Sequence, residues 1–205
     1  MQGALIEEYE RIHARTGKAY GTTGRNSLPC ILPHILALRP DSLVDYGCGR
    51  SDLAALLARK AGIREIACYE PAIPELADRP GRTFDVLVNV DVFEHIPDEE
   101  IDAAAKDMQS MARHAILVID MATTGKRLAD GRSAHVSVHD QNWWLKRLSP
   151  VWPSLRPIEP LRPHRAAFKT WDEELPPFRH WAIARRELWA RRFRRLTRSR
   201  FQAAS

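Results

Sequence analysis

The sequence predicts an α/β protein with a Rossmann-like, doubly wound sheet and helices on both faces. The first observation is a series of short, mostly apolar runs typical of buried strands, at 42–46, 65–69, 84–90 and 115–120. The second is the helical spacing of apolar residues in two intervening segments, 51–61 and 98–112. Apolar strands that alternate with helices are typical of a parallel sheet buried on both faces.

The composition is that of an ordinary globular protein with a basic carboxyl-terminal segment. With 205 residues, of which 44% are hydrophobic and 28% charged, the chain can bury one core. The net charge of +5 comes from 179–200, which holds nine arginines against one acid, Glu187. Three cysteines without a C-x-x-C pair favour small core residues over disulfides or a zinc module. We expect a cytoplasmic protein, since the sequence has neither a recognisable signal peptide nor an apolar run of membrane-spanning length.

Three parts are expected along the chain: an N-terminal helical cap at 1–40, a Rossmann-like binding domain at 41–175 and a basic amphipathic helix at 176–205. In the cap, Tyr9, His13 and Tyr20 are candidates to close over a ligand. The alternative for these side chains is amphipathic packing with a solvent-facing histidine.

The middle of the sheet is predicted to be reduced. Residues 71–83 are too few for a helix, a strand and a second helix, so we expect one strand of the usual sheet to be lost there. After the strand at 115–120 we expect an extended piece at 134–138, a helix at 141–148 and a last edge strand at 166–171.

A glycine turn after the first strand marks the expected binding site. Asp45 stands at the carboxyl end of that strand, and Gly47 and Gly49 allow a tight turn that brings the backbone close to a ligand. Two further acids, Glu70 and Asp91, end the next two strands. Ligands of open parallel sheets bind outside these strand ends, and Glu70 lies about where an acid reaches ribose hydroxyls.

Three motifs in order carry a family resemblance. Leu43-Val-Asp-Tyr-Gly-Cys-Gly-Arg resembles the first motif of class I S-adenosylmethionine-dependent methyltransferases, in particular small bacterial enzymes of the type 11 and type 12 groups. Glu70 is similar to their acidic ribose ligand, and Phe84–Ile96 resembles their fourth-strand motif. The resemblance covers about residues 42–120 and implies S-adenosylmethionine as the cofactor. It implies a cofactor site formed by Asp45, Gly47, Cys48, Gly49, Glu70, Asp91 and Val92.

The charge of the turn supports this cofactor over a dinucleotide. A G-x-G-x-x-G turn that starts at Gly47 has Asp52 in place of its last glycine, and a carboxylate there repels a pyrophosphate. S-adenosylmethionine has no phosphate and carries a positive sulfonium, which suits an acidic rim of Asp45, Asp52, Glu70 and Asp91. Because the usual third strand and its acid are missing, Arg82, Thr83 or backbone groups are expected at the adenine.

The acceptor side is less defined. Methyl transfer is a direct displacement, and a base helps when the acceptor is a hydroxyl or a protonated amine. Candidate catalytic residues are His135 and His95, the latter with a packing role as its alternative; Glu94 and His139 are also near the expected site. Even spacing would place His135 and His139 on one face. No resident metal is expected, and Trp143 and Trp144 are expected in the core rather than in an acceptor pocket.

The expected function is methylation of a small-molecule or glycan acceptor, at oxygen rather than nitrogen. The alternatives are a nucleic-acid methyltransferase anchored by the arginine-rich helix and a non-catalytic S-adenosylmethionine-binding protein. Trp181, Leu188, Trp189, Phe193 and Leu196 share one face of that helix. The helix is expected to dock on the domain or on a second subunit, with contact to a membrane surface or to nucleic acid as alternatives.

Overall fold

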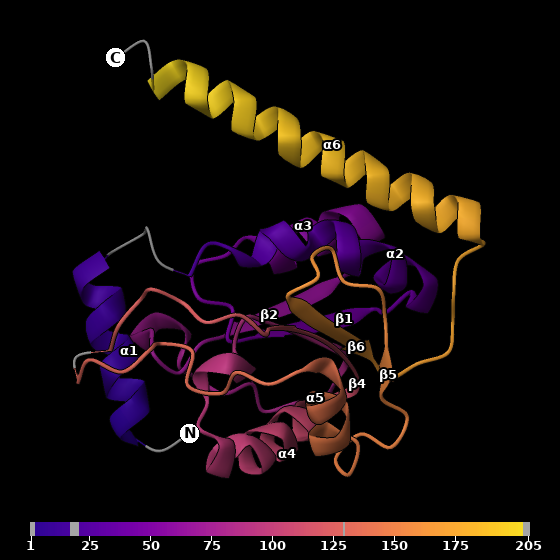
Figure 1. Ribbon diagram of the computed structural model, residues 1–205. Coiled ribbons are helices and arrows are strands. Elements are labelled where there is room, and N and C mark those ends of the chain that lie inside the picture. The colour runs from indigo at the N-terminus through magenta and orange to yellow at the C-terminus, as the bar shows by residue number, and fades with distance from the viewer. Residues whose placement is uncertain (1–2, 17–20, 129, 203–205) are drawn as a thin grey trace.

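A six-stranded sheet forms the centre of the computed structural model, which describes residues 3–16, 21–128 and 130–202 (Figure 1). The strand order is β2-β1-β3-β4-β6-β5. The first four strands are parallel, and the last two are antiparallel to their neighbours. The strands are β1 (Ser42–Tyr46), β2 (Glu65–Tyr69), β3 (Phe84–Val90), β4 (Ala112–Asp120), β5 (Arg156–Pro157) and β6 (Arg165–Lys169).

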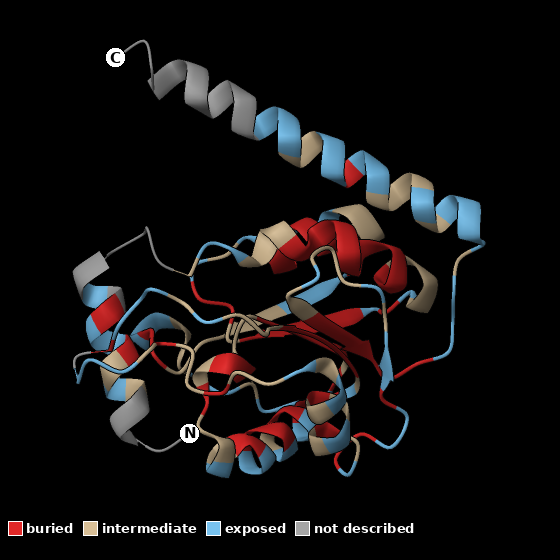
Figure 2. Ribbon diagram, in the orientation of Figure 1, coloured by how far each residue is buried: buried red, intermediate tan, exposed pale blue. Residues whose placement is uncertain are grey.

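Helices cover both faces of the sheet, which confirms the predicted doubly wound α/β fold. One buried cluster joins one sheet face to α2 (Leu28–Leu38) and α3 (Leu53–Ala61). A second joins the other face to α4 (Ile101–Met111) and α5 (Gln141–Leu148). Figure 2 shows these two layers as buried surfaces on either side of the strands. Helix α1 (Gly3–Thr16) lies to one side, in contact with the 121–136 region through a small third cluster.

The predicted loss of a strand is confirmed. Between β2 and β3 the structure has only a single 3₁₀ turn, Pro74–Leu76, so β2 ends the sheet. The expected edge strand at 166–171 exists as β6, but its place at the edge was wrong. It lies between β4 and the two-residue β5, because a short piece of the proline-rich segment adds one more strand outside it. Prolines remove backbone donors and hid this strand from pattern analysis.

Helix α6 (Pro177–Gln202) docks on α2 with the side opposite to the one its sequence suggests (Figure 1). Glu187 is 2% exposed and accepts a hydrogen bond from Nζ of Lys60 at 2.9 Å. The aromatic and leucine side chains instead face solvent, and Trp189 is 60% exposed. The expected docking of the helix on the domain is present, but in the described part of α6, which excludes the side chain of Leu196, the apolar face does not make it. Docking of that face on a second subunit stays a prediction. No described helix combines the length and the apolarity that crossing a membrane requires.

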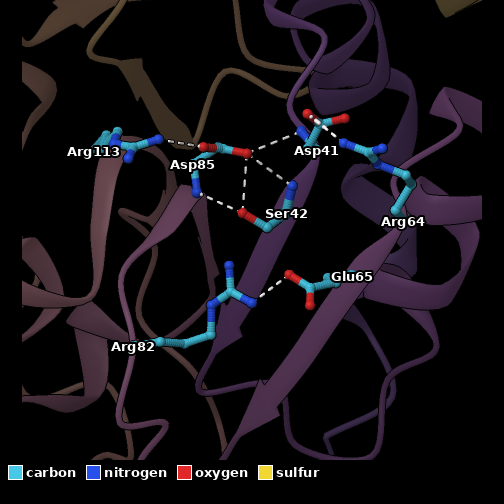
Figure 3. Close-up of polar contacts among 7 residues, drawn as sticks. All are labelled: Asp41, Ser42, Arg64, Glu65, Arg82, Asp85 and Arg113. Carbon is cyan, nitrogen blue, oxygen red and sulfur yellow. Dashed lines mark hydrogen bonds and ion pairs between the residues drawn. The ribbon is translucent and has the colours of Figure 1, made fainter.

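Polar groups connect the amino ends of the strands (Figure 3). Asp85 accepts hydrogen bonds from the backbone N–H groups of Asp41 and Ser42 and from Oγ of Ser42, each at 3.0 Å. Arg113, near the start of β4, donates to the same carboxylate at 2.8 Å. Arg82 is bound to Glu65 at the start of β2. These contacts join the amino-terminal ends of the strands, at the end of the sheet opposite to the cavity described below.

Candidate functional site

A cavity of about 440 Å³ opens at the carboxyl ends of the parallel strands. It is lined by the nine residues that were predicted to bind the cofactor or to take part in catalysis: Asp45, Gly47, Cys48, Gly49, Glu70, Asp91, Val92, His95 and His135. Such a volume is typical of pockets for small molecules and cofactors. Arg82 and Thr83 do not line it, so their predicted adenine role was wrong; Arg82 lies at the other end of the sheet.

The glycine turn has a geometry that only glycine adopts easily. Gly47 and Gly49 have φ of 71° and 52°, in the left-handed region. A Cβ on Gly47 would lie 2.4 Å from Cγ2 of Val92, and one on Gly49 would lie 2.8 Å from the carbonyl oxygen of Gly21. The N–H of Gly47 donates to the carbonyl of Tyr69 at 2.8 Å, which joins the turn to the end of β2. The turn thereby packs close to both neighbouring segments.

Glu70 links the glycine turn to the segment after β2. One carboxylate oxygen accepts from the N–H of Gly49 and the other from the N–H of Ala72, both at 3.1 Å. Burial raises the pKa of Glu70, while these two backbone donors oppose the rise. Each carboxylate oxygen has a further acceptor position, so the group can still receive two hydroxyls from a ligand.

Asp45 is a buried carboxyl that faces the cavity. It is 3% exposed, and its Oδ2 has no hydrogen-bond partner among the described atoms. Burial raises its pKa to about 8, with Cys68 and Glu70 adding to the rise. A positively charged group in the cavity would favour the ionised form and would provide the missing partner.

Asp91 belongs to an ion network that the sequence did not predict. Its backbone has φ of 59°, rare for a residue other than glycine, and its carboxylate pairs with Arg165 at the start of β6. Arg165 also reaches Asp120, at the end of β4, at 3.3 Å. Asp120 could have been predicted as a fourth acid at a strand end. Arg165 could not, because no pattern in the proline-rich sequence around it marks it as a site residue. Asp52, predicted for the acidic rim, points away and pairs with Arg25 at 3.2 Å.

Two histidines and a glutamate form the wall beyond the third strand. Nδ1 of His95 lies 2.7 Å from the carbonyl oxygen of Ala134, and Nδ1 of His135 lies 2.6 Å from that of Ala122. The two rings meet edge to face with centroids 5.0 Å apart. Burial lowers the pKa of His95 to about 4, so its ring is neutral at physiological pH. Glu94 is fully buried, and burial raises the pKa of its carboxyl well above the ordinary value.

His139 does not join this wall, so the prediction that it shares a face with His135 was wrong. Residues 134–138 form no strand, because the N–H groups of Val136 and Ser137 both bond to the carbonyl of Glu94. The ring of His139 instead stacks on Trp143 at 3.6 Å. Trp144 is fully buried in the core, as expected.

Helix α1 contributes Ile6 and Tyr9 to the lining of the cavity. The hydroxyl of Tyr9 lies 2.8 Å from Nδ1 of His95 and donates to the carbonyl of Ala134 at 3.3 Å. Tyr9 therefore lines the site, as the sequence suggested. The side chain of His13 and all of Tyr20 lie outside the described residues.

Solved structures share this architecture at low sequence identity. A DhpI–S-adenosylhomocysteine complex matches with a TM-score of 0.52 at 16% identity, covering 82% of this chain and 97% of that one. An O-methyltransferase family protein from Burkholderia thailandensis gives 0.55 at 11% identity, covering 75% and 58%. The plantazolicin methyltransferase BpumL, in complex with S-adenosylhomocysteine, gives 0.56 at 8% identity, covering 83% and 95%. No curated protein matches the chain significantly.

The six-stranded sheet with helices on both faces has the Rossmann-like fold of these methyltransferase structures. A family model for the methyltransferase domain matches residues 20–196. The chain belongs to that family, and the prediction of an S-adenosylmethionine-dependent methyltransferase is confirmed.

Proposed function

We propose that the protein transfers the methyl group of S-adenosylmethionine to a hydroxyl of a small-molecule acceptor. The observation that supports this most is the wall formed by Glu94, His95 and His135. Each Nδ1 faces a carbonyl, which can only accept, so a ring that carries one proton holds it on Nδ1 and keeps an unprotonated Nε2. A wall of lone pairs suits an acceptor that arrives with an O–H bond.

The cofactor would lie across the strand ends with its charged groups against acids. Glu70 would receive the two ribose hydroxyls while it still holds Gly49. Asp45, with its unpartnered oxygen, would face the ammonium of the methionine part. The turn at Gly47 and Gly49 would allow close approach of that part, and Cys48, Asp91 and Val92 would complete the contact. This arrangement directs the sulfonium methyl toward the wall.

The chemical step is a single displacement. The acceptor oxygen forms a bond to the methyl carbon as the S–C bond breaks, and its electron pair remains on sulfur. The hydroxyl proton passes to a lone pair on the wall or to water. Holding the two reactants in line contributes most of the rate enhancement of such a reaction.

A small acceptor is favoured by the enclosed volume and by two of the structural relatives. The relatives include a DhpI complex with S-adenosylmethionine and HEP, and the plantazolicin methyltransferase. Glycan and nucleic-acid acceptors have only the arginines of α6 in their favour. A cytoplasmic location remains a prediction that agrees with the three free cysteines. The division at 40 and 175 also remains a prediction, as does the non-catalytic alternative.

The test combines cofactor binding with methyl transfer. Isothermal titration with S-adenosylhomocysteine should give one site per chain. Labelled S-adenosylmethionine should then transfer methyl to small hydroxyl compounds in a panel that also contains matched amines. His135→Ala should lower the transfer rate, whereas His139→Ala should not, because His139 lies outside the cavity. Transfer to amines alone, or equal loss in both variants, would refute the proposal.

A further inference from the structure

The wall of the cavity contains a compact group of three ligating side chains. Glu94, His95 and His135 each place one ligand atom so that the three atoms lie within 4.8 Å of one another. Two of the three are consecutive after β3, and His135 comes from the segment whose backbone bonds to the carbonyl of Glu94. The chain fold thus brings His135 next to Glu94 and His95, which lie 41 and 40 residues earlier in the sequence.

Hydrogen bonds fix which ring nitrogens are free. Nδ1 of His95 donates to the carbonyl of Ala134, and Nδ1 of His135 donates to that of Ala122. A ring that carries only this one proton therefore presents Nε2 as a lone pair. Metal-binding histidines in proteins are held in the same way, with the second nitrogen bonded to a backbone carbonyl or a carboxylate.

The burial of the glutamate is an independent observation that points to a cation ligand. Glu94 is fully buried, and neither carboxylate oxygen has a hydrogen-bond partner among the described residues. A buried carboxylate without a partner destabilises the fold unless a cation or a proton compensates its charge. With Glu94 ionised, all three groups can offer an electron pair to a cation.

The surrounding charges also favour a cation. Asp91, Asp120 and Glu94 gather around one guanidinium, that of Arg165, which bonds to the two aspartates. Lys126 also lines the cavity and opposes a positive charge on His95. Three carboxylates against these two cations leave room for a further positive charge at the wall.

We propose that Glu94, His95 and His135 bind a divalent transition-metal ion. Two imidazoles with one carboxylate suit Zn²⁺, Mn²⁺, Fe²⁺ or Co²⁺, whereas Mg²⁺ prefers oxygen ligands alone. Three protein ligands leave positions open for a ligand from the cavity.

The role of the ion rests on the proposed function. An acceptor hydroxyl that occupies an open position would lose its proton to water more readily, and its oxygen would then attack the methyl carbon. An acceptor with two neighbouring oxygens could bind through both. The acceptor class inferred from the site is therefore a small molecule with adjacent oxygen ligands, such as a diol or a hydroxy acid.

Metal binding is measured first without any methyl acceptor. The full chain is stripped with a chelator and titrated calorimetrically with Zn²⁺ and Mn²⁺, and Co²⁺ binding is followed by its visible absorption. Glu94→Gln and His135→Ala should each weaken binding at least tenfold, with His139→Ala as the matched control. A second described group, His34, Glu174 and His180, is also close enough to hold an ion, so His180→Ala is titrated in parallel.

The outcomes separate the two proposals. Binding lost in His180→Ala but kept in His135→Ala, or no binding at all, overturns the metal site. Full methyl transfer by the stripped enzyme overturns the catalytic role of the ion while the methyltransferase proposal stands. If the metal-loaded protein binds its ion but not S-adenosylhomocysteine, the proposed function fails and the metal site survives. Thermal melting of each variant shows whether it has folded.

Discussion

Replacing Glu70 by glutamine should weaken cofactor binding much more than it weakens the fold. In the proposed complex, the carboxylate accepts both ribose hydroxyls in addition to the N–H groups of Gly49 and Ala72, which it already holds at 3.1 Å. Glutamine removes the charge and one acceptor oxygen, and its NH₂ group must face one of the two backbone donors. A hydrogen bond to a charged group contributes about 1.5–3 kcal/mol to the free energy, and we expect the loss of one such bond to the ribose. The dissociation constant for S-adenosylhomocysteine should therefore rise roughly 10- to 150-fold.

The measurement is isothermal titration of S-adenosylhomocysteine into wild type and Glu70→Gln. Glu75→Gln is the matched control, because Glu75 is an exposed acid five residues further on that does not line the cavity. The loss of charge is the same in both variants, so a general electrostatic effect would weaken both. Affinity within twofold of wild type for Glu70→Gln in a folded protein would refute the assignment of Glu70 to the ribose.

Three further changes test the framework around the site. Gly49→Ala should lower the melting temperature and abolish detectable cofactor binding, because its Cβ would lie 2.8 Å from the carbonyl of Gly21 at a positive φ; normal calorimetric binding would contradict this. Asp85→Asn should lower the free energy of unfolding by about 2 kcal/mol at pH 7. Hydrogen bonds lower the pKa of Asp85 in the folded protein, so this stabilisation exists above the unfolded pKa of about 4 and disappears as the pH falls further. If the difference in unfolding free energy between wild type and variant is the same at pH 3 as at pH 7, the prediction is wrong. Lys60→Met should speed amide hydrogen exchange in α6, because it leaves the carboxylate of Glu187 buried without the Lys60 amine. The double variant Lys60→Met with Glu187→Met should restore the slower exchange. Protection equal to wild type in the single variant would show that the pair does not hold the helix.

The cofactor side of the site was predictable because local patterns determine it. Asp45, Glu70 and Asp91 each follow an apolar run, and parallel strands place such positions together at the carboxyl end of the sheet. Their hydrogen bonds were not predictable. That Glu70 holds Gly49, and that Asp91 is neutralised by Arg165, depends on contacts between segments 21 and 74 residues apart.

The acceptor side and α6 show why pattern analysis failed elsewhere. Alternation of apolar residues at 134–138 suggested a strand, but the N–H of Val136 bonds to Glu94 rather than to a neighbouring strand, and His139 is directed elsewhere. In α6, helical periodicity identified an aromatic face correctly, but the opposite side is the docked one, and it carries the ion pair between Glu187 and Lys60. Periodicity locates a face and does not determine what covers it.

The loss of one strand also affects how the protein can meet another chain. Strand β2 ends the sheet with five residues, and Ile66 on it is 42% exposed. The opposite edge, β5, has two residues, one of them a proline, and is a poor template for pairing. An added strand, from a partner or from a second copy, would therefore pair with β2 and end next to Glu70.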